Sequence, residues 1–528
     1  MPRNSNSALT IVWTTAAADM FKTITKNIFS NYVGIAGTII IAFMLSPYLV
    51  HTLGDTKYGV WSVISALTGY MALLDLGISS AIAKYVAKYK ALKDYKSLNT
   101  VLASGLVIMM SVGTLLVLIS PLIAGFMVDV FKFEGELGES VHLLVLIASL
   151  DIAIFVTTGI LVGSMYGFQR HEIINGVSLT VTLMNACFFY LVLQNGYDLV
   201  AMGIVNLAGN IFAAIVYFYA LAKIEPDASL NVRNAKKPVV GSIFTFSKYT
   251  FLSMLAMQLV YYSDAFVIGF FMSAAAITYY TIPWSLSEYT NKLIHAIAET
   301  FVPVFSEQDA TQGNQAIYAT YVSGTKFMLM ISNLLCIGVL VMGDNFVSLW
   351  MGEKYAVACS TILSIMFFTQ LIKGPQLLSY SILLGTANHR KFSFYNFAFS
   401  LLNLVLSIIF IQRYGLVGVA GATAFTQICF YGIITPILTS RVIGSNLLEY
   451  LRETYLRIVP ASLVLLVMLV WFARVNPPDS YLLLISQALF AAVIYVFVCY
   501  WTLLNRQERQ FLVEKVSVVT SRLSIARA

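Results

Sequence analysis

Residues 101–126 read VLASGLVIMMSVGTLLVLISPLIAGF and contain no charged side chain. A helix of about 20 mostly apolar residues crosses the hydrocarbon core of a bilayer, so this stretch predicts a transmembrane helix. Similar stretches recur along the whole chain. The predicted spans are 28–50, 58–78, 99–127, 141–164, 173–194, 198–222, 249–271, 276–299, 317–343, 356–385, 392–411, 415–439, 456–474 and 480–503. We therefore expect an all-α integral membrane protein with about fourteen transmembrane helices.

The composition supports a membrane protein. Hydrophobic residues make up 59% of the sequence and charged residues 11%, and the mean hydropathy is +0.81. A soluble domain is about 45–50% apolar and about 25% charged, so lipid must be the solvent of this chain. The net charge of +7 does not indicate nucleic-acid binding, because the basic residues lie in short segments between the spans.

The sequence contains no recognisable catalytic motif. It has no Walker A run and no GxSxG or HExxH sequence. The five cysteines lie in apolar segments without a CxxC pair, as expected of packing residues; they are Cys187, Cys336, Cys359, Cys429 and Cys499. We expect a protein without enzymatic activity, cofactor or metal site.

The loop charges predict the orientation, because cytoplasmic loops are rich in Lys and Arg. With the N-terminus inside, the inner segments carry Lys84, Lys88, Lys90, Lys93, Lys96, Arg170, Lys223, Arg233, Lys236, Lys237, Arg390, Lys391, Arg441, Arg452, Arg457 and the tail from Arg506. The outer loops hold only Lys57, Lys132, Lys354, Arg413 and Arg474, and the loop 129–139 is acidic. We expect both termini in the cytoplasm. The apolar stretch 9–13 is too short for a signal peptide, so residues up to Lys26 are interpreted as an interfacial lead-in.

The chain divides into two similar halves. We predict an N-terminal lobe at 1–222, a cytoplasmic linker at 223–240, a C-terminal lobe at 241–440, and helices 13 and 14 with a basic cytoplasmic tail at 441–528. Five matches lie in order at offsets of 217–219 residues: 29–32 (FSNY) with 246–249 (FSKY), 104–105 with 323–324 (both SG), Gly167 with Gly385, Asn185 with Asn403, and 199–200 with 416–417 (both LV). Each copy has six helices, an even number, so both enter the membrane in the same orientation. A pseudo-two-fold axis along the membrane normal is expected.

Several short motifs resemble one family of transporters. They are 57–62 (KYGVWS), 73–81 (LLDLGISSA) followed by 84–87 (KYVA), 262–269 (YSDAFVIG) with Tyr279 and Tyr280, and 415–421 (GLVGVAG). Over roughly residues 25 to 440, the chain resembles the polysaccharide biosynthesis transporters. These are the Wzx-type lipid-linked oligosaccharide flippases of the MOP (multidrug/oligosaccharidyl-lipid/polysaccharide) superfamily.

The resemblance implies a two-lobed fold of fourteen helices with a central cavity. It implies translocation of an undecaprenyl-diphosphate-linked oligosaccharide across the bacterial inner membrane by alternating access, for surface polysaccharides such as O-antigen and lipopolysaccharide. By analogy, helices 13 and 14 help form a groove for the lipid tail. The implied partners are the lipid-linked oligosaccharide, membrane lipids and the polysaccharide polymerase machinery, and no nucleic acid.

The predicted helix 276–299 carries the densest group of polar residues. Ser285, Glu288, Lys292, His295 and Glu299 follow at steps of three and four, which places them on one helix face. Such a stripe must face the bundle interior or a water-filled cavity, where a cation would attract a diphosphate. In the alternative interpretation, Glu288 and Lys292 only neutralise each other and hold helices together.

Three lysines lie within or near other spans. Lys373 precedes Gly374 and Pro375, which should break or kink the helix, and a charged, broken helix commonly lines a cavity. Alternatively, its side chain extends to an interface. Lys248 is a further cavity candidate, although Lys248 and Lys326 both lie nearer the cytoplasmic ends of their spans, where extension to the interface is the simpler interpretation.

Four acidic residues are candidates for ion coupling, because a carboxylate can take a proton or coordinate sodium; they are Asp75, Asp151, Asp264 and Glu288. Asp75 has a structural alternative, since the sequence Asp-Leu-Gly could simply end a helix. Asp264 could equally make a hydrogen bond between packed helices. Asp151 has no partner that the sequence reveals.

Three other functions remain open. A MATE-like, cation-coupled multidrug antiporter would need a mainly acidic cavity, which Lys292 and Lys373 disfavour. A polymerase or ligase would need a large outer loop with catalytic groups, and the outer loops here are short. A lipid II flippase is the nearest alternative, although it suggests a cavity richer in arginine.

Overall fold

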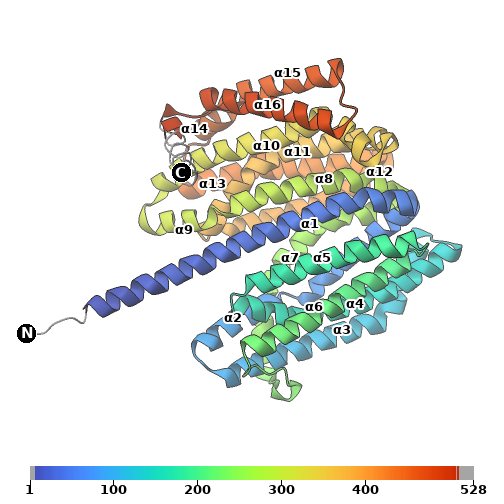
Figure 1. Ribbon diagram of the computed structural model, residues 1–528, viewed down its shortest axis with the longest axis vertical. Helices are drawn as coiled ribbons and strands as arrows, with labels where there is room; N and C mark the ends of the chain where they lie inside the picture. Colours follow the sequence, from blue (N-terminus) through green and yellow to red (C-terminus); the bar gives the residue numbers. More distant parts are fainter. Residues whose placement is uncertain (1–5, 507, 511–528) are drawn as a thin grey trace, which may run out of the picture. The chain divides into compact units, whose positions relative to one another are not determined.

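The computed structural model describes residues 6–506 and 508–510, without the side chains of 6–33, 72, 246–250, 252–253, 256–257, 259–261 and 389. All regular elements of this described part are helical (Figure 1). The first are α1 (Asn6–Met71), η1 (Ala72–Asp75), α2 (Ile78–Ala91), α3 (Tyr95–Phe131), α4 (Gly135–Gly167), α5 (His171–Gln194), α6 (Leu199–Ile224), η2 (Val232–Asn234), α7 (Lys237–Phe271) and α8 (Ala274–Glu299). The others are α9 (Val302–Thr311), α10 (Asn314–Met351), α11 (Glu353–Gly385), α12 (His389–Gln427), η3 (Ile428–Ile434), α13 (Thr435–Ile443), α14 (Leu447–Leu451), η4 (Arg452–Leu456), α15 (Arg457–Val475) and α16 (Tyr481–Thr502).

The described helices account for the fourteen expected spans. Ten stretches are long and apolar enough to cross a membrane. Two of them contain a break, at Gly54 (φ 74°) and Gly415 (φ 56°), so each consists of two helices. Glycine suits these positions because it has no Cβ to clash at positive φ. The two remaining helices are α7 and α8, with 35 and 26 residues, which is enough to span a bilayer.

The apolar residues of α16 show how one helix faces protein and lipid. Ala491 and Tyr495 are buried and pack in a cluster with α15 and α10. On the other side, Leu482, Leu489 and Val493 are 80%, 62% and 69% exposed. Large exposed apolar surfaces of this kind are rare on soluble monomers, whereas lipid solvates them readily. The helix therefore has one protein-facing and one lipid-facing side.

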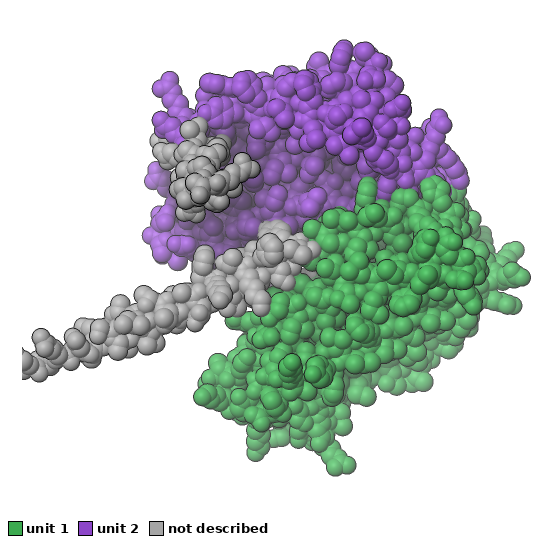
Figure 2. Space-filling model, viewed as in Figure 1, with its two compact units in different colours: residues 1–278 green, residues 279–528 purple. Residues whose placement is uncertain are grey.

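The chain forms two compact units, residues 1–278 and 279–528 (Figure 2). In the first unit α7 packs against α1, α2 and α3. The unit boundary therefore lies in the first turns of α8, after α7, whereas the predicted lobes divide at the 223–240 segment before α7. The predicted lobe boundaries rest on the internal repeat and stay a prediction.

Close helix contacts recur in the two units at the predicted offset. In the first unit, a Cβ placed on Gly167 at the end of α4 would lie 2.8 Å from the Cβ of Val86 in α2. In the second, a Cβ on Gly385 at the end of α11 would lie 3.1 Å from the Cβ of Phe305 in α9. Both glycines let a short helix pack closely on the end of a long one. The repeat seen in sequence is thus accompanied by equivalent packing.

Turns and polar contacts follow the same repeat. Gln169 and Ala387, two residues after these glycines, both adopt positive φ, at 59° and 56°. The Asn185 amide donates to Asn206 Oδ1 at 2.9 Å, between α5 and α6. The Asn403 amide donates to Thr423 Oγ1 at 2.9 Å, across the break in α12. The two units therefore share an equivalent hydrogen bond between neighbouring helices, formed by asparagines at matching positions of the repeat.

Candidate functional site

The polar residues of α8 lie beside its packed face. Leu286, Ile294 and Ala298 of α8 are buried in the second unit. The stripe next to them is more accessible: Ser285, Glu288 and His295 are half-buried, and Lys292 and Glu299 are exposed. The α8 stripe, as we call these five residues, thus keeps its polar groups within reach of water or of a polar ligand.

Glu288 is connected to α11 through two buried amides. Its Oε2 accepts a hydrogen bond from the Asn291 amide at 3.5 Å, and Asn291 Oδ1 accepts one from the Gln370 amide at 3.2 Å. Asn291 and Gln370 are only 5% and 3% exposed. Sequence reasoning missed both residues because they are uncharged. The available signal was a pair of amides within spans, where buried polar groups need partners.

Lys373 of α11 is the buried cation of this group. It is 8% exposed, and its Nζ lies 5.6 Å from the centre of the Tyr431 ring. Glu288 lies close enough to interact electrostatically with Lys373, and less strongly with Lys292. Glu288 therefore has one cationic neighbour on α8 and one on another helix, α11. The ring of Tyr431, which the sequence did not single out, adds a favourable surface for the ammonium group.

Lys292 and His295 are less tightly held. No ion pair or hydrogen bond to Lys292 Nζ is formed with the residues that the structure describes. Glu288 and Lys292 therefore form no direct ion pair, although their charges interact, and the structural interpretation of the stripe stays an alternative. His295 Nδ1 lies 3.4 Å from Glu299 Oε1, with both side chains partly exposed. The site thus combines a buried lysine, an accessible lysine and a carboxylate that interacts electrostatically with both.

The helix that carries Lys373 does not break at Pro375, contrary to one of the predicted outcomes. α11 continues from Glu353 through Pro375 to Gly385. A Cβ on Gly374 would lie 2.5 Å from Ser332 Oγ in α10, so the two helices pack very closely at this point. Such neighbouring helices allow proline inside a membrane helix.

The remaining lysines differ from each other. The Lys248 side chain lies outside the described residues, so its predicted place in a cavity is untested. Lys326 is 2% exposed and its Nζ lies 3.0 Å from Glu508 Oε2. Whether the Lys326 side chain extends to the membrane interface stays a prediction. Its ammonium group is held within the second unit by a carboxylate that is distant in sequence.

The three candidate aspartates all lie in the first unit, but in separate surroundings. Asp75 accepts hydrogen bonds from the Ser79 hydroxyl and, at 3.4 Å, from the Ser79 amide, so it caps the start of α2. Asp151 accepts a 2.7 Å hydrogen bond from the Asn210 amide, between α4 and α6. Asp264 is 5% exposed and lies near Tyr70 of α1. Each aspartate thus takes part in helix packing, and their roles in ion coupling stay predictions.

Comparison with known proteins agrees with the class that the sequence predicts, a membrane transporter of polysaccharide biosynthesis. Residues 24–309 match the family described as polysaccharide biosynthesis protein. The chain is 23% identical over 396 residues to the "Probable low-salt glycan biosynthesis flippase Agl15" of Haloferax volcanii, which covers 73% of this chain and 77% of that protein. It is 20% identical over 405 residues to a "Putative O-antigen transporter" of Shigella flexneri, with 75% and 93% covered.

Solved structures show that the fold is shared. A structure described as "Lipid II flippase MurJ, inward closed conformation" superposes with a TM-score of 0.71 at 16% identity, covering 89% of this chain and 98% of that one. At this identity the similarity concerns the fold alone. The family match, in contrast, spans more than half of the sequence. The chain belongs to the polysaccharide biosynthesis protein family.

Proposed function

We propose that this chain is a flippase for an undecaprenyl-diphosphate-linked oligosaccharide. It moves this lipid from the cytoplasmic to the outer leaflet of the bacterial inner membrane by alternating access, without covalent chemistry. Its family and its relatives named as a glycan flippase and an O-antigen transporter support this assignment. We also propose that both termini lie in the cytoplasm and that the polysaccharide polymerase machinery takes up the product.

The observation that carries the proposal is the charge arrangement of Glu288, Lys373 and Lys292. A charge at the centre of a membrane costs about 2.5–3.5 kcal/mol on insertion scales, so a buried lysine needs a compensating group. Glu288, whose charge interacts with that of Lys373, is the group that we propose for this role in the absence of substrate. A diphosphate carries the same sign of charge as Glu288 and can replace it as the partner of Lys373. Lys292, which is exposed, makes the first contact with the diphosphate.

This exchange of partners would couple transport to an ion. Once the diphosphate neutralises Lys373, the Glu288 carboxylate loses its strongest favourable interaction. It can then take a proton or a sodium ion, and release it when the substrate leaves. Substrate binding and ion binding are thus linked through one carboxylate, as alternating access requires of a coupled transporter.

The neighbouring neutral groups suit the glycan. The amides of Asn291 and Gln370 and the aromatic ring of Tyr431 lie next to the charged residues. Amides donate to and accept from hydroxyl groups, and aromatic rings pack on the apolar faces of sugars. A drug antiporter that carries free hydrophobic cations would have little use for two lysines here. The site therefore favours an anionic, sugar-bearing lipid.

The proposal is tested by substituting Lys292 in cells that depend on this chain for surface glycan. Lys292→Ala and Lys292→Glu should lower glycan export while the amount of protein in the membrane stays normal, and Lys292→Arg should partly restore it. Lys132→Glu is the control, because Lys132 is exposed between α3 and α4. Normal export by Lys292→Glu at equal abundance would show that capture of an anion at this site is wrong.

A further inference from the structure

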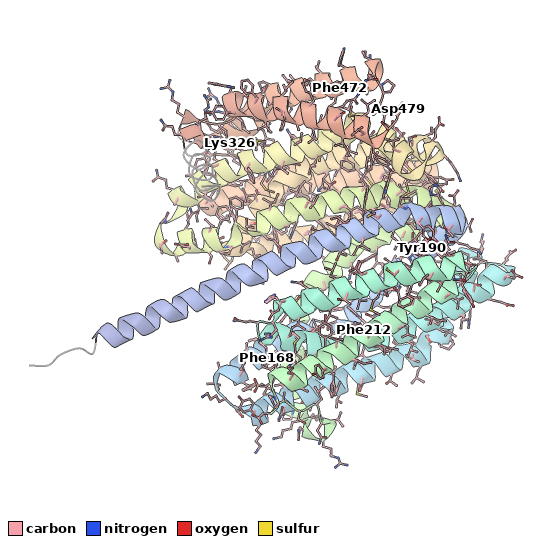
Figure 3. All side chains as sticks on the ribbon, viewed as in Figure 1. Phe168, Tyr190, Phe212, Lys326, Phe472 and Asp479 are labelled. Carbon is pink, nitrogen blue, oxygen red and sulfur yellow. The ribbon has the colours of Figure 1, made fainter. Side chains whose placement is uncertain are left out.

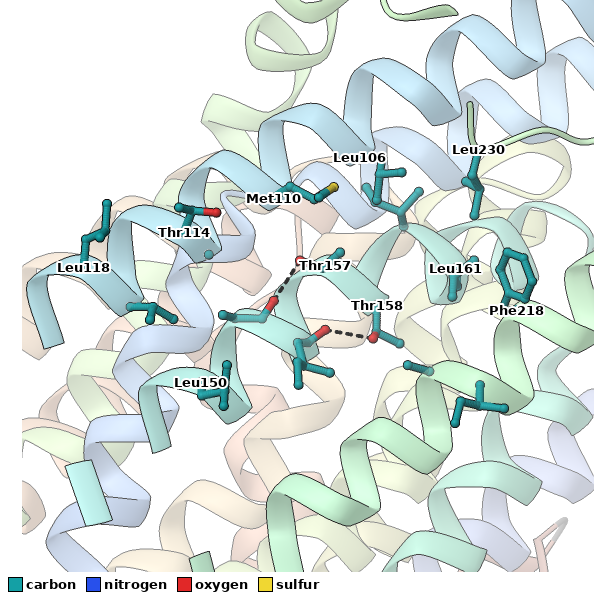
Figure 4. Close-up of a pocket in the computed structure, with 17 residues that line it drawn as sticks. Leu106, Met110, Thr114, Leu118, Leu150, Thr157, Thr158, Leu161, Phe218 and Leu230 are labelled. Atoms are coloured by element: carbon teal, nitrogen blue, oxygen red, sulfur yellow. Dashed lines mark hydrogen bonds between the residues drawn. The ribbon is translucent and has the colours of Figure 1, made fainter. Parts of the chain in front are cut away.

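The first unit contains an apolar groove that is separate from the α8 stripe. Side chains of α3, α4 and α6 line it, and its volume is about 660 Å³ (Figure 4). Leu118 and Leu150 lie at one end, and Leu106 and Phe218 lie toward the other. Leu230, from the connection between α6 and α7, joins them at that second end.

The groove offers mainly hydrocarbon contacts along its middle, with the hydroxyl group of Thr114 as a further polar atom in its lining. The hydroxyl groups of the lining residues Thr157 and Thr158 donate to the carbonyl oxygens of Ala153 and Ile154, at 2.7 and 2.8 Å (Figure 4). These hydroxyl protons are therefore already used within α4. A polar or sugar-bearing ligand would lose its bonds to water here without replacement, which is unfavourable. An alkyl chain has no such cost.

The connection between α6 and α7, residues 225–236, closes one end of the groove and is hydrogen-bonded to α3. Asn99 Oδ1 accepts from the Ser229 amide at 2.7 Å, and the Asn99 side chain donates to the Asp227 carbonyl at 2.9 Å. The Lys236 amide donates to Ser104 Oγ at 3.1 Å. Leu230 lies between these attachment points. The polar connection and the apolar groove therefore meet at a defined place.

That end of the groove is basic. Arg233 and Lys236 of the connection and Lys237, the first residue of α7, are exposed, and none forms an ion pair within the described chain. The acidic residues of the connection are Glu225 and Asp227. They lie near Tyr95, at the end of the connection that follows α6. Unpaired basic residues at a membrane surface attract anionic lipid headgroups. An apolar groove that ends at such residues has the charge pattern of an anionic lipid.

The length of the groove matches one leaflet. Leu106 and Leu118 are twelve residues apart in α3, which corresponds to about 18 Å at the rise of an α-helix. The hydrocarbon core is about 30 Å thick, so one leaflet measures about 15 Å. A single acyl chain has this reach, whereas a long polyprenyl chain would extend well beyond it.

We propose that this groove binds an anionic glycerophospholipid of the surrounding membrane. One acyl chain lies along α3, α4 and α6, and the phosphate contacts Arg233, Lys236 and Lys237. The bound lipid holds the α6–α7 connection, which joins the two repeated halves. It is a component of the folded protein rather than its cargo, so its binding does not depend on the substrate of the α8 stripe.

Binding is tested with the purified full-length protein and dioleoyl phosphatidylglycerol, using phosphatidylcholine as the neutral lipid. Native mass spectrometry should show tightly bound phosphatidylglycerol, which should also raise the thermal unfolding temperature more than phosphatidylcholine. Ala214→Trp and Thr157→Trp, which fill the groove at two points, should each remove this binding. Ala488→Trp, on the exposed side of α16, is the matched control and should retain it.

A second variant separates the headgroup from the chain. Neutralising Arg233, Lys236 and Lys237 to Gln should lower the preference for phosphatidylglycerol over phosphatidylcholine by about a hundredfold, because each basic residue near the surface attracts anionic lipid by about 1 kcal/mol. Unchanged lipid binding in both tryptophan variants, or unchanged preference in the triple variant, would overturn the proposal. Displacement of the phospholipid by undecaprenyl phosphate would also overturn it, since the groove would then hold the carrier lipid.

Discussion

Removal of the Glu508 carboxylate should strongly destabilise the second unit. Lys326, labelled in Figure 3, is 2% exposed in α10, and the Glu508 side chain is 17% exposed. The Lys326 ammonium group donates to both carboxylate oxygens, at 3.0 and 3.2 Å. Ser323 Oγ and the backbone N–H of Asn505 donate to the same carboxylate at 2.9 and 2.8 Å. Glu508→Ala leaves the buried ammonium group without its charged partner.

The two halves of this ion pair should not be equivalent. Breaking a buried pair by removing one partner costs about 3–5 kcal/mol, which we expect for Glu508→Ala. Lys326→Met should cost less, about 1–3 kcal/mol, because the carboxylate keeps Ser323 and Asn505 as donors. In the double variant no buried ammonium remains. It should therefore be more stable than Glu508→Ala alone, a non-additive result that identifies the pair.

Stability is measured by thermal unfolding of the purified variants in one detergent or nanodisc. Equal unfolding temperatures for Glu508→Ala and the unsubstituted protein would refute the reasoning, as would strictly additive effects in the double variant. The pH dependence gives a second readout. Burial by itself raises the pKa of Glu508, but the hydrogen bonds from Asn505, Lys326 and Ser323 outweigh it and hold the pKa below its usual value. This stabilisation is present above the usual pKa of a glutamate and is lost as the pH falls through the lowered value; Glu508→Gln should abolish the dependence.

Three further predictions concern the rest of the chain. Reporter fusions should place Glu134, Asp344 and Pro477 outside and Lys90, Lys236, His389 and Gln507 inside; a reversal between adjacent spans would contradict the fourteen-helix topology. Asp151→Asn should retain the fold and glycan export if Asp151 only pairs with Asn210, whereas loss of export at normal abundance would support ion coupling. Gly167→Ala and Gly385→Ala should each lower the free energy of unfolding by about 1–3 kcal/mol through overpacking, and with it the unfolding temperature, while Gly125→Ala, with no neighbour within 4 Å of the added Cβ, should be neutral; equal tolerance at all three would contradict the close helix contacts.

Membrane residence, the spans and the repeat could be predicted because they depend on local properties. Transfer into lipid sums over residues within one helix, so residues 101–126 predict a span whatever the other helices do. The repeat was visible because glycines at close contacts tolerate few substitutes. Gly167 and Gly385 both stand where a Cβ would lie about 3 Å from another helix. The α8 stripe was likewise a property of one helix, since spacing alone puts Glu288 and Lys292 on the same face.

The partners of the charged residues were decided by tertiary structure. Glu288 interacts electrostatically with Lys373 of another helix, Asp151 bonds to Asn210, and Lys326 is held by Glu508. In each case the two residues lie on different helices or far apart in the chain, and a shift of one residue along either helix would rotate a side chain by about 100° and separate them. Helical periodicity determines which residues share a face, but only the packed bundle determines which faces meet. For that reason the sequence predicted the type of site, whereas its electrostatic partners required the structure.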